Sequence, residues 1–238
     1  MKVEIWSDVV CPWCYIGKRH FEDALSRFGH ADQVEVEWRS FELDPRSPAH
    51  VGMPMSRVLE RKYGMTREQA EAANRRMTDL AAGVGLEYHL DEVQVGNTFD
   101  AHRLIHLASA HGLGDAMKER LLAAYFTEGR SPSDRDTLTG LAVEVGLDPD
   151  EVATTLAGDR FATEVRHDEA RATSFGLSGV PFFVFDEAFG VSGAQPAEVL
   201  LGALEQAWSD PHSIAVAGTT GTDGDVGDAA CADGTCAV

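Results

Sequence analysis

The sequence predicts an α/β fold in which a β-α-β half and a β-β-α half flank a large block of helices. Three observations point to this class. Residues 2–6 alternate like a strand and are followed by a helical pattern and a second alternating segment at 34–38. Helical patterns alone then run from about residue 45 to 175. Strand-like segments return at 182–191. A period of two indicates a strand, whereas recurrence at i, i+3, i+4 and i+7 indicates a helix.

The first half can be read from local spacing. Val3 and Ile5 fall on one face of the first strand. Pro12 suits a first helical turn, and apolar residues at 21, 24, 25 and 28 keep helical spacing. We therefore expect a helix over residues 12–28 that stops at Gly29. A β-α-β unit with a connection of this length should be parallel and right-handed.

The middle of the chain predicts helices only. A capping box at Thr66–Gln69 opens one of them, which should run to about Val84. The others are expected from Met53-Pro54-Met55 onward and over residues 97–110, 115–127, 133–145, 148–157 and 159–175. None of them repeats with an obvious period.

The second half predicts a hairpin and a final helix. Its strands are expected at 182–185 and 189–191, with a turn at 186–187 and a helix over 197–208. We divide the chain into a discontinuous domain (1–44 and 176–208), a helical insertion (45–175) and a tail (209–238). The tail is rich in Gly, Asp, Ala and Thr, and we expect it to be flexible or loosely docked.

Composition excludes several classes of function. The 238 residues are 44% hydrophobic and 25% charged, which is typical of a soluble globular protein. A formal net charge of −19 argues against binding nucleic-acid phosphates or an anionic membrane surface. The first residues enter a strand without an apolar signal segment, and no apolar run approaches the roughly 18 residues of a membrane helix. We therefore expect a cytoplasmic protein.

The motif Cys11-Pro12-Trp13-Cys14 lies between the first strand and the first helix. The N–H groups and the positive end of a helix stabilise a thiolate there and lower its pKa from about 8.5 to roughly 3.5–7.5. We expect Cys11 to be a partly exposed nucleophile and Cys14, one turn deeper, to be the resolving thiol. Two alternatives stay open, namely half of a zinc site and a pair of inert cysteines. Pro12 and Trp13 should tune the reduction potential, and Trp13 either contacts a partner protein or packs on the helical block.

Three segments, taken together, resemble one family. They are residues 7–17 around the CPWC motif, Asn97-Thr98-Phe99-Asp100-Ala101-His102-Arg103, and Gly179-Val180-Pro181-Phe182-Phe183-Val184. The chain resembles the thioredoxin fold in its DsbA-like form, and most closely the cytoplasmic FrnE-type members. Relatives of that group include the hydroxychromene carboxylate isomerases and the kappa-class glutathione transferases. The resemblance spans about residues 1–208.

The resemblance implies a substrate site around the two thiols. It implies a cis peptide bond between Val180 and Pro181 that faces Cys11, where the backbone pairs with an extended substrate segment. It also implies that Asn97 and His102 lie across the active site, where they shape the cleft or cap their helix.

Asp8 and the histidines each have a plain interpretation beside the functional one. Asp8 could accept a proton from Cys14, or it could make a hydrogen bond at the end of the strand. His102 and His106 have the i, i+4 spacing of a metal pair, but solvated or core histidines are several times more common and no third ligand is near in sequence. Asp100 suits the first turn of a helix.

Cys231 and Cys236 form a second pair in the tail. A CxxxxC loop that contains Gly can close into a disulfide, and some FrnE-type proteins resemble this chain in having one. Our hypothesis is a mobile redox pair that exchanges electrons with Cys11 and Cys14. The alternatives are a pair that oxidises adventitiously and a zinc cluster that uses all four cysteines.

The sequence as a whole predicts a protein dithiol–disulfide oxidoreductase that forms a mixed disulfide at Cys11. Its partners are protein thiols and disulfides, without a bound cofactor or metal, and with glutathione as a candidate co-substrate. A monomer and a homodimer are both compatible with the sequence. A glutathione-dependent isomerase or transferase on the same fold and a zinc-binding module remain as alternatives. The isomerase relatives usually have Ser where Cys11 stands, which counts against the first alternative.

Overall fold

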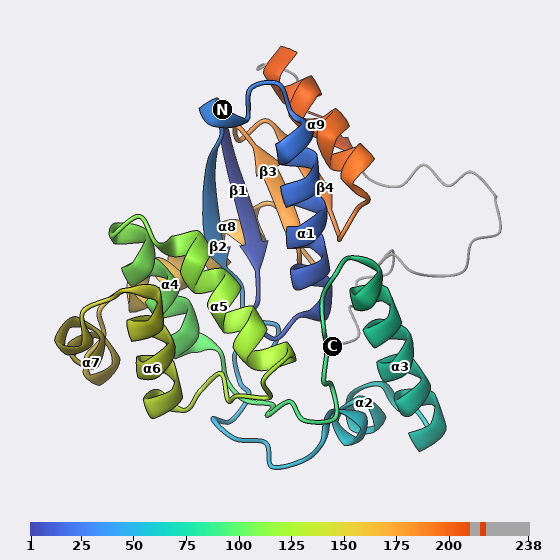
Figure 1. Cartoon of the computed structure of the whole chain (residues 1–238), viewed down its shortest axis with the longest axis vertical. Helices are drawn as coiled ribbons and strands as arrows, with labels where there is room; N and C mark the ends of the chain where they lie inside the picture. The colour runs from blue at the N-terminus through green and yellow to red at the C-terminus, as the bar shows by residue number, and fades with distance from the viewer. Residues whose placement is uncertain (210–214, 218–238) are drawn as a thin grey trace.

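A five-stranded mixed sheet forms the centre of the computed structural model, which describes residues 1–209 and 215–217 (Figure 1). The order across the sheet is β2-β1-β3-β4-β5. The strands are β1 (Lys2–Ser7), β2 (Glu35–Ser40), β3 (Phe182–Phe185), β4 (Phe189–Ser192) and β5 (Ala215–Ala217). β1 runs parallel to β2, β3 runs antiparallel to β1 and β4, and β5 runs parallel to β4. The predicted β-α-β and β-β-α halves are therefore confirmed.

The helices follow the predicted segments to within a few residues. They are α1 (Pro12–Arg27), α2 (Met55–Tyr63), α3 (Arg67–Gly83), α4 (Phe99–Ala110), α5 (Gly114–Phe126), α6 (Arg135–Val145), α7 (Pro149–Ala157), α8 (Ala162–Ser174) and α9 (Ala197–Ser209). Both hydrogen bonds of the predicted capping box between Thr66 and Gln69 are present. Local signals were sufficient here because a cap and its partner lie within one helical turn.

Helices cover both faces of the sheet. α1 and α9 pack together on one face, where Phe21 stacks on Phe183 with ring centroids 5.6 Å apart. α8 covers the other face, where Trp6 donates its indole N–H to the Asp168 carbonyl oxygen at 2.9 Å. β1 is therefore buried on both sides, and Glu4 and Trp6 face α8. This burial explains why its alternation in hydrophobicity is incomplete.

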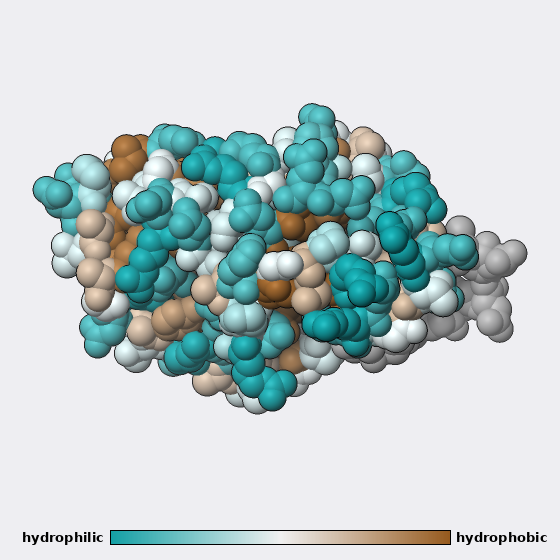
Figure 2. Space-filling view, turned by 90° about the horizontal axis from the view of Figure 1, so that it is seen from below, coloured by the Kyte–Doolittle hydropathy of each residue, from teal (hydrophilic) through white to brown (hydrophobic). Residues whose placement is uncertain are grey.

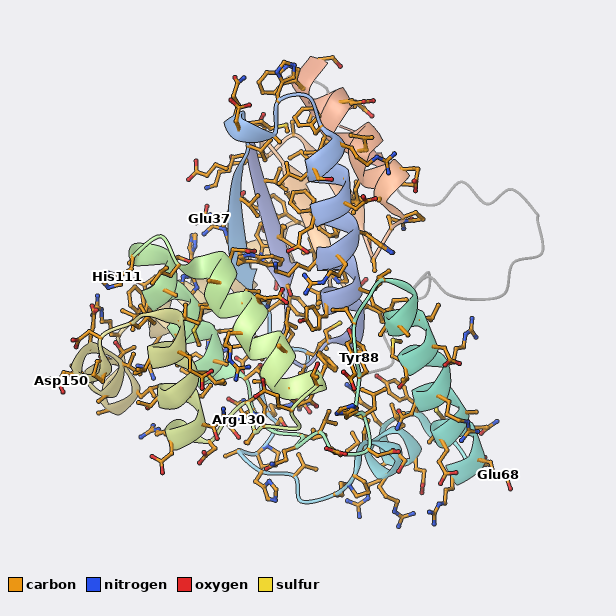
Figure 3. The ribbon with its side chains drawn as sticks, in the orientation of Figure 1. Glu37, Glu68, Tyr88, His111, Arg130 and Asp150 are labelled. Carbon is orange, nitrogen blue, oxygen red and sulfur yellow. The ribbon has the colours of Figure 1, made fainter. Side chains whose placement is uncertain are left out.

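The inserted helices form two groups in Figure 1. α4 to α7 lie beside the β2 edge of the sheet, and α2 and α3 lie below the N-terminal end of α1. The segment between α3 and α4 passes close to the start of α1. There Tyr88, labelled in Figure 3, donates its hydroxyl to the Pro12 carbonyl oxygen at 2.8 Å. Tyr88 also stacks on Phe126 of α5, so it fixes the start of α1 against the insertion.

One strand lies in the predicted tail. Ala215–Ala217 pairs with β4 as an edge strand, whereas we expected residues 209–238 to be disordered or loosely docked. Ala-Val-Ala among small and polar residues carries no strand signal, so only the pairing with β4 reveals it. Cys231 and Cys236 lie outside the described residues.

Candidate active site

The two cysteines lie at the junction of β1 and α1, as the sequence predicted. β1 ends at Ser7, Cys11 is the N-cap residue of α1, and Pro12 occupies its first turn. The Cys14 N–H donates to the Cys11 carbonyl oxygen at 3.0 Å, which places the second cysteine one turn into the helix. Both thiols are free.

The predicted partial exposure of Cys11 is wrong. Cys11 is 0% exposed and Cys14 is 1% exposed. Both belong to a small apolar cluster of buried residues on the α8 side of β1. Its members are Trp6, Cys11, Cys14, Ala172, Val180 and Val184, with Trp13, Phe41, Leu43, Leu177 and Phe182 packed against it. Residues more than 150 positions further along the chain thus cover the thiols, and local spacing could not reveal this.

Cys11 lies beside the Val180–Pro181 peptide bond, which is cis. Its Sγ donates to the Val180 carbonyl oxygen, 3.5 Å away. The Pro181 carbonyl oxygen in turn accepts from the Gly193 N–H at 2.9 Å, so β4 supports the segment. The structure therefore brings the first and third family segments together at one sulfur atom.

The charge of the dithiol is distributed differently from the prediction. Burial raises the pKa of the Cys11 thiol, and the neighbouring Cys14 and the Asp8 charge raise it further. Burial also disfavours a Cys14 thiolate, but a hydrogen bond from Cys11 and the charge of Lys118 outweigh it and lower the Cys14 pKa. The Cys14 N–H at the start of α1 lowers the Cys11 pKa, as expected at a helix end, but burial and the neighbouring Cys14 outweigh it. Of the two thiols, Cys14 is therefore the more acidic.

Asp8 is held by hydrogen bonds at the end of β1. Its carboxylate accepts from the Val9 N–H at 2.7 Å, the Leu43 N–H at 2.8 Å and His102 Nε2 at 3.2 Å. Burial would raise the Asp8 pKa, but His102 and the Leu43 N–H reverse the effect and lower it. A carboxylate with a lowered pKa is a poor proton acceptor near neutral pH.

The second family segment supplies residues to different places. Asn97 accepts from the Phe99 N–H at 2.9 Å and donates to Glu42 at 3.1 Å, near the start of α4. His102 reaches Asp8, whereas His106 contacts Ser40 Oγ at 3.0 Å. The two histidines thus have separate partners. Within the described ranges, no cluster of three or more metal-ligating side chains occurs.

Lys118 on α5 is a neighbour of the thiols that the sequence did not reveal. It is 1% exposed, and its Nζ donates to the Ser7 carbonyl oxygen at 3.2 Å. Nζ also lies 5.5 Å from the centre of the Trp38 ring. A single lysine in an amphipathic helix usually faces solvent, so only the packing of α5 against the sheet identifies it as part of the site.

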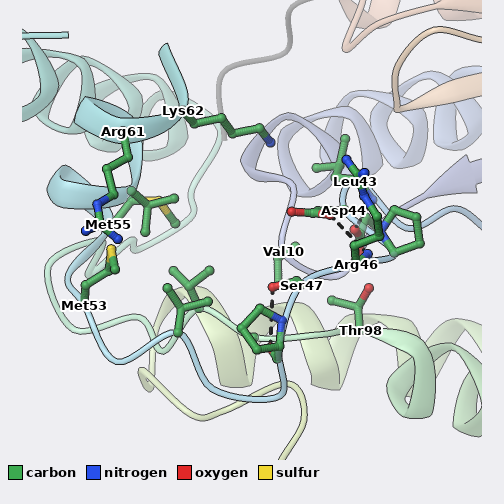
Figure 4. Close-up of a pocket in the computed structure, with 17 residues that line it drawn as sticks. Val10, Leu43, Asp44, Arg46, Ser47, Met53, Met55, Arg61, Lys62 and Thr98 are labelled. Atoms are coloured by element: carbon green, nitrogen blue, oxygen red, sulfur yellow. Dashed lines mark hydrogen bonds between the residues drawn. The ribbon is translucent and has the colours of Figure 1, made fainter. Parts of the chain in front are cut away.

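Two pockets adjoin the motif. The larger, of about 840 Å³, extends from Val10 between the 43–53 segment and α2. Figure 4 shows Arg61 and Lys62 on one side of it and Asp44 and Arg46 on the other. None of the three cations forms an ion pair with another described residue, although most basic side chains of this acidic chain do. Seen from below, this end of the molecule is mostly hydrophilic, with apolar patches between the polar side chains (Figure 2).

The smaller pocket, of about 430 Å³, is apolar and lies beside Pro12 and Trp13. Leu59 and Met77 of α2 and α3 form part of its opposite wall. Trp13 is half-buried, so it packs on the helical block and also leaves part of its ring accessible. In the part of the chain that the structure covers, no helix has the length and apolar character needed to cross a membrane.

Comparisons with known proteins agree with this geometry. Residues 2–205 match the model of the DSBA-like thioredoxin domain family. The probable DsbA oxidoreductase SCO1869 from Streptomyces coelicolor is 47% identical, with a TM-score of 0.85 over 96% of this chain and 100% of that chain. YwbO of Bacillus subtilis, an uncharacterized protein, is 30% identical over 85% of this chain and 94% of its own length.

A more distant structure shares the fold alone. The cytosolic disulfide reductase DsbM from Pseudomonas aeruginosa, solved with GSH, is 18% identical, with a TM-score of 0.64 over 88% of this chain and 100% of that chain. The match of the family model covers strands β1 to β4, the CPWC motif and the inserted helices together. The chain therefore belongs to the DSBA-like thioredoxin domain family.

Proposed function

We propose that the protein catalyses thiol–disulfide exchange with protein substrates through a mixed disulfide at Cys11. The observation that carries this proposal is the position of Cys11 Sγ, at the start of α1 and 3.5 Å from the Val180 carbonyl oxygen. Cys11 and Val180 are both buried, so an extended substrate segment beside Val180 would bring its own sulfur to Cys11 once it displaces the apolar side chains that cover them. Trp13 and the apolar pocket beside it offer a surface for the flanking side chains.

Proton transfer between the two neighbouring thiols supplies the nucleophile. Transfer of the Cys11 proton to Cys14 leaves a Cys11 thiolate, which attacks a substrate disulfide and expels one substrate thiolate. Cys14 then loses its proton, attacks Cys11 Sγ and expels the second substrate thiolate. The lowered pKa of Cys14 favours this second step.

The test is reduction of insulin with dithiothreitol as electron donor. Cys11→Ser should abolish catalysis, because no mixed disulfide can form. Cys14→Ser, reduced and then freed of dithiothreitol before insulin is added, should accumulate a covalent adduct between Cys11 and the substrate, visible on a non-reducing gel. A Cys11→Ser protein with full activity would refute the proposal.

Cys231 and Cys236 are the proposed second redox pair. Their CxxxxC spacing and their place in a tail without large apolar residues support the idea. Cys231→Ser combined with Cys236→Ser should slow turnover with a protein disulfide while leaving the first covalent adduct intact. Unchanged turnover would remove the pair from the mechanism.

Glutathione is the second candidate substrate, because the larger pocket has unpaired cations beside the motif. Arg46 and Arg61 could meet its two carboxylates, and GSH is present in the DsbM structure, which shares the fold. Arg46→Gln with Arg61→Gln should raise the KM for glutathione about tenfold, with little change for insulin. Arg57→Gln is the matched control, since Arg57 lies on α2, pairs with Glu60 and does not line the pocket. If Arg57→Gln changed the KM for glutathione as much as the pocket variant does, this pocket would be excluded as the glutathione site.

A further inference from the structure

Lys118 is a buried ammonium group without a carboxylate partner among the described residues. Lys18 offers a direct comparison. Lys18 is also buried and lies 5.8 Å from the same Trp38 ring, but it forms ion pairs with Glu22, Asp115 and Glu119. An ammonium group removed from water and left unpaired is costly, so a negative charge must compensate Lys118.

The groups that face Lys118 identify this compensating charge. From the β1–α1 junction they are the thiols of Cys14 and Cys11, the Asp8 carboxylate and the Ser7 carbonyl oxygen. β2 contributes the Trp38 ring, and α1 contributes the like charge of Lys18. Asp8 already accepts two backbone N–H groups and contacts His102. The Cys14 thiolate is therefore the main anion available to Lys118, and it exists only while the dithiol is reduced.

We propose that Lys118 is a positioning residue that holds Cys14 as a thiolate in the reduced protein and releases its own proton when the disulfide closes. This inference rests on the proposed function. It assigns to α5, an element of the helical insertion, control over the proton balance of the dithiol.

The electron and proton balance is complete. The reduced site holds one proton on Cys11 and one on Lys118, and Cys14 is a thiolate. Formation of the Cys11–Cys14 disulfide transfers two electrons to the substrate disulfide, whose two sulfur atoms leave as thiolates. The Cys11 proton and the Lys118 proton convert these thiolates to thiols, either directly or through solvent. The oxidised site then holds neither a thiolate nor a buried unpaired ammonium.

The electrostatics of the reduced site agree with this cycle. Burial lowers the pKa of Lys118 to about 8, although Cys14, Asp8 and Cys11 each raise it. Oxidation removes the two sulfur contributions and leaves the burial, so the Lys118 pKa must fall further. The ammonium is consequently less stable in the oxidised protein than in the reduced one.

The pH dependence of the reduction potential tests the proposal. The full chain with Cys231→Ser and Cys236→Ser is equilibrated in glutathione buffers, and the Cys11–Cys14 disulfide is quantified after alkylation. For two electrons a tenfold change in equilibrium constant is about 30 mV, so each proton released contributes about 30 mV per pH unit. Ultraviolet absorbance of the thiolate marks the range in which Cys14 is ionised.

Three proteins should differ in that range. In the wild type, the slope of the reduction potential against pH should be about 60 mV per pH unit near pH 8, where two protons are released on oxidation. It should fall to about 30 mV per pH unit at lower pH, where one proton is released. In Lys118→Met both thiols should stay protonated, so the slope should be about 60 mV per pH unit throughout. The Cys11–Cys14 disulfide of this variant should also form about tenfold more readily against glutathione at neutral pH, because its reduced form lacks the stabilising interaction between the Lys118 ammonium and the Cys14 thiolate. Lys118→Arg retains the charge but cannot release a proton, and should follow about 30 mV throughout.

Each outcome decides the question. Methionine in place of an unpaired buried lysine should not impair folding, so wild type against Lys118→Met is sufficient if Lys118→Arg is unstable. Lys18→Met is the matched control and should keep the wild-type break in slope. Equal slopes for wild type and Lys118→Met would overturn the inference. A Cys11–Cys14 pair that never exchanges with glutathione would instead overturn the proposed function.

Discussion

Gly17 of α1 faces Pro181 so closely that a β-carbon at position 17 would lie 2.9 Å from Pro181 Cγ. The same β-carbon would lie 3.5 Å from the Ala194 Cα. α1 can therefore approach the Val180–Pro181 segment only where it has no side chain. Since Cys11 begins this helix and contacts the Val180 carbonyl oxygen, the approach sets the distance between the thiol and the Val180–Pro181 segment.

Gly17→Ala should accordingly reduce insulin reduction about tenfold and cost about 1–3 kcal/mol of unfolding free energy, because the added methyl displaces Pro181. Urea denaturation and the insulin assay measure the two effects. Gly202→Ala on α9 is the matched control, since its β-carbon would meet no atom within 4 Å. There the helix propensity of Ala should stabilise the protein by up to about 1 kcal/mol. Equal behaviour of the two variants would contradict the steric explanation.

Asp8→Asn should lower the pKa of the Cys11 thiol, because the Asp8 charge is one of the causes that raise it. The amide N–H2 would also face a backbone N–H in place of an acceptor, at a cost of about 1–3 kcal/mol. Thiolate absorbance during a pH titration of a Cys14→Ser background isolates the Cys11 pKa. Asp115→Asn is the control, since Asp115 is exposed and contacts Lys18 and Trp38. A Cys11 pKa that Asp8→Asn leaves unchanged would remove Asp8 from the electrostatics of the site.

Glu4→Gln should weaken the attachment of α8 to the sheet. Glu4 is 1% exposed and accepts from Arg39 at 2.7 Å and from Arg171 at 2.7 and 3.0 Å. Burial would raise the Glu4 pKa, but the two arginines outweigh it and lower it. Arg39 keeps its ion pairs with Glu37 and Asp168, and Arg171 keeps its ion pair with Glu187. Loss of the buried carboxylate should therefore cost about 1–3 kcal/mol at neutral pH.

The same carboxylate gives a pH signature. Because the folded pKa of Glu4 is depressed, its contribution is fully present above the unfolded value of about 4.3 and is lost as pH falls through the folded value. Urea denaturation at a series of acidic pH values should show a steeper loss of stability in the wild type than in Glu4→Gln. Parallel curves would show that Glu4 contributes nothing to acid unfolding.

Sequence patterns predicted the elements because their signals are local. Pro12, the Thr66–Gln69 box and Pro149 each mark a helix start within one turn of it. The family segments also placed Cys11 and Val180 side by side, since the resemblance carries the topology with it. What local patterns predicted about the thiols themselves was less accurate.

The features of the site that the sequence did not predict depend on contacts between distant segments. Ala172 of α8 and Val180 help to bury Cys11, and Lys118 of α5 lowers the pKa of Cys14. A lysine in a helix has no pattern that distinguishes a solvent-facing ammonium from one aimed at a thiol. Burial and pKa direction could therefore be assigned only after the helices had been placed on the sheet.

Arg103 lies in the same family segment as His102. We expect it to stabilise the fold without taking part in thiol–disulfide exchange. Its guanidinium is buried and donates to the carbonyl oxygens of Arg160 at 2.9 Å and Gly158 at 2.8 Å, and also to that of Thr155. These acceptors close the end of α7 and the turn before α8. A lysine cannot reproduce this planar set of donors, so Arg103→Lys should cost about 2–3 kcal/mol of unfolding free energy.

Insulin reduction by folded Arg103→Lys should stay near the wild-type rate, because Arg103 is not among the groups that most strongly shift the pKa of either thiol. Arg135→Lys is the matched control. Arg135 shares the Asp100 carboxylate with Arg103 but is 62% exposed, so its loss should change stability by less than about 0.5 kcal/mol. A fall in exchange rate without a fall in stability would instead place Arg103 in the active site.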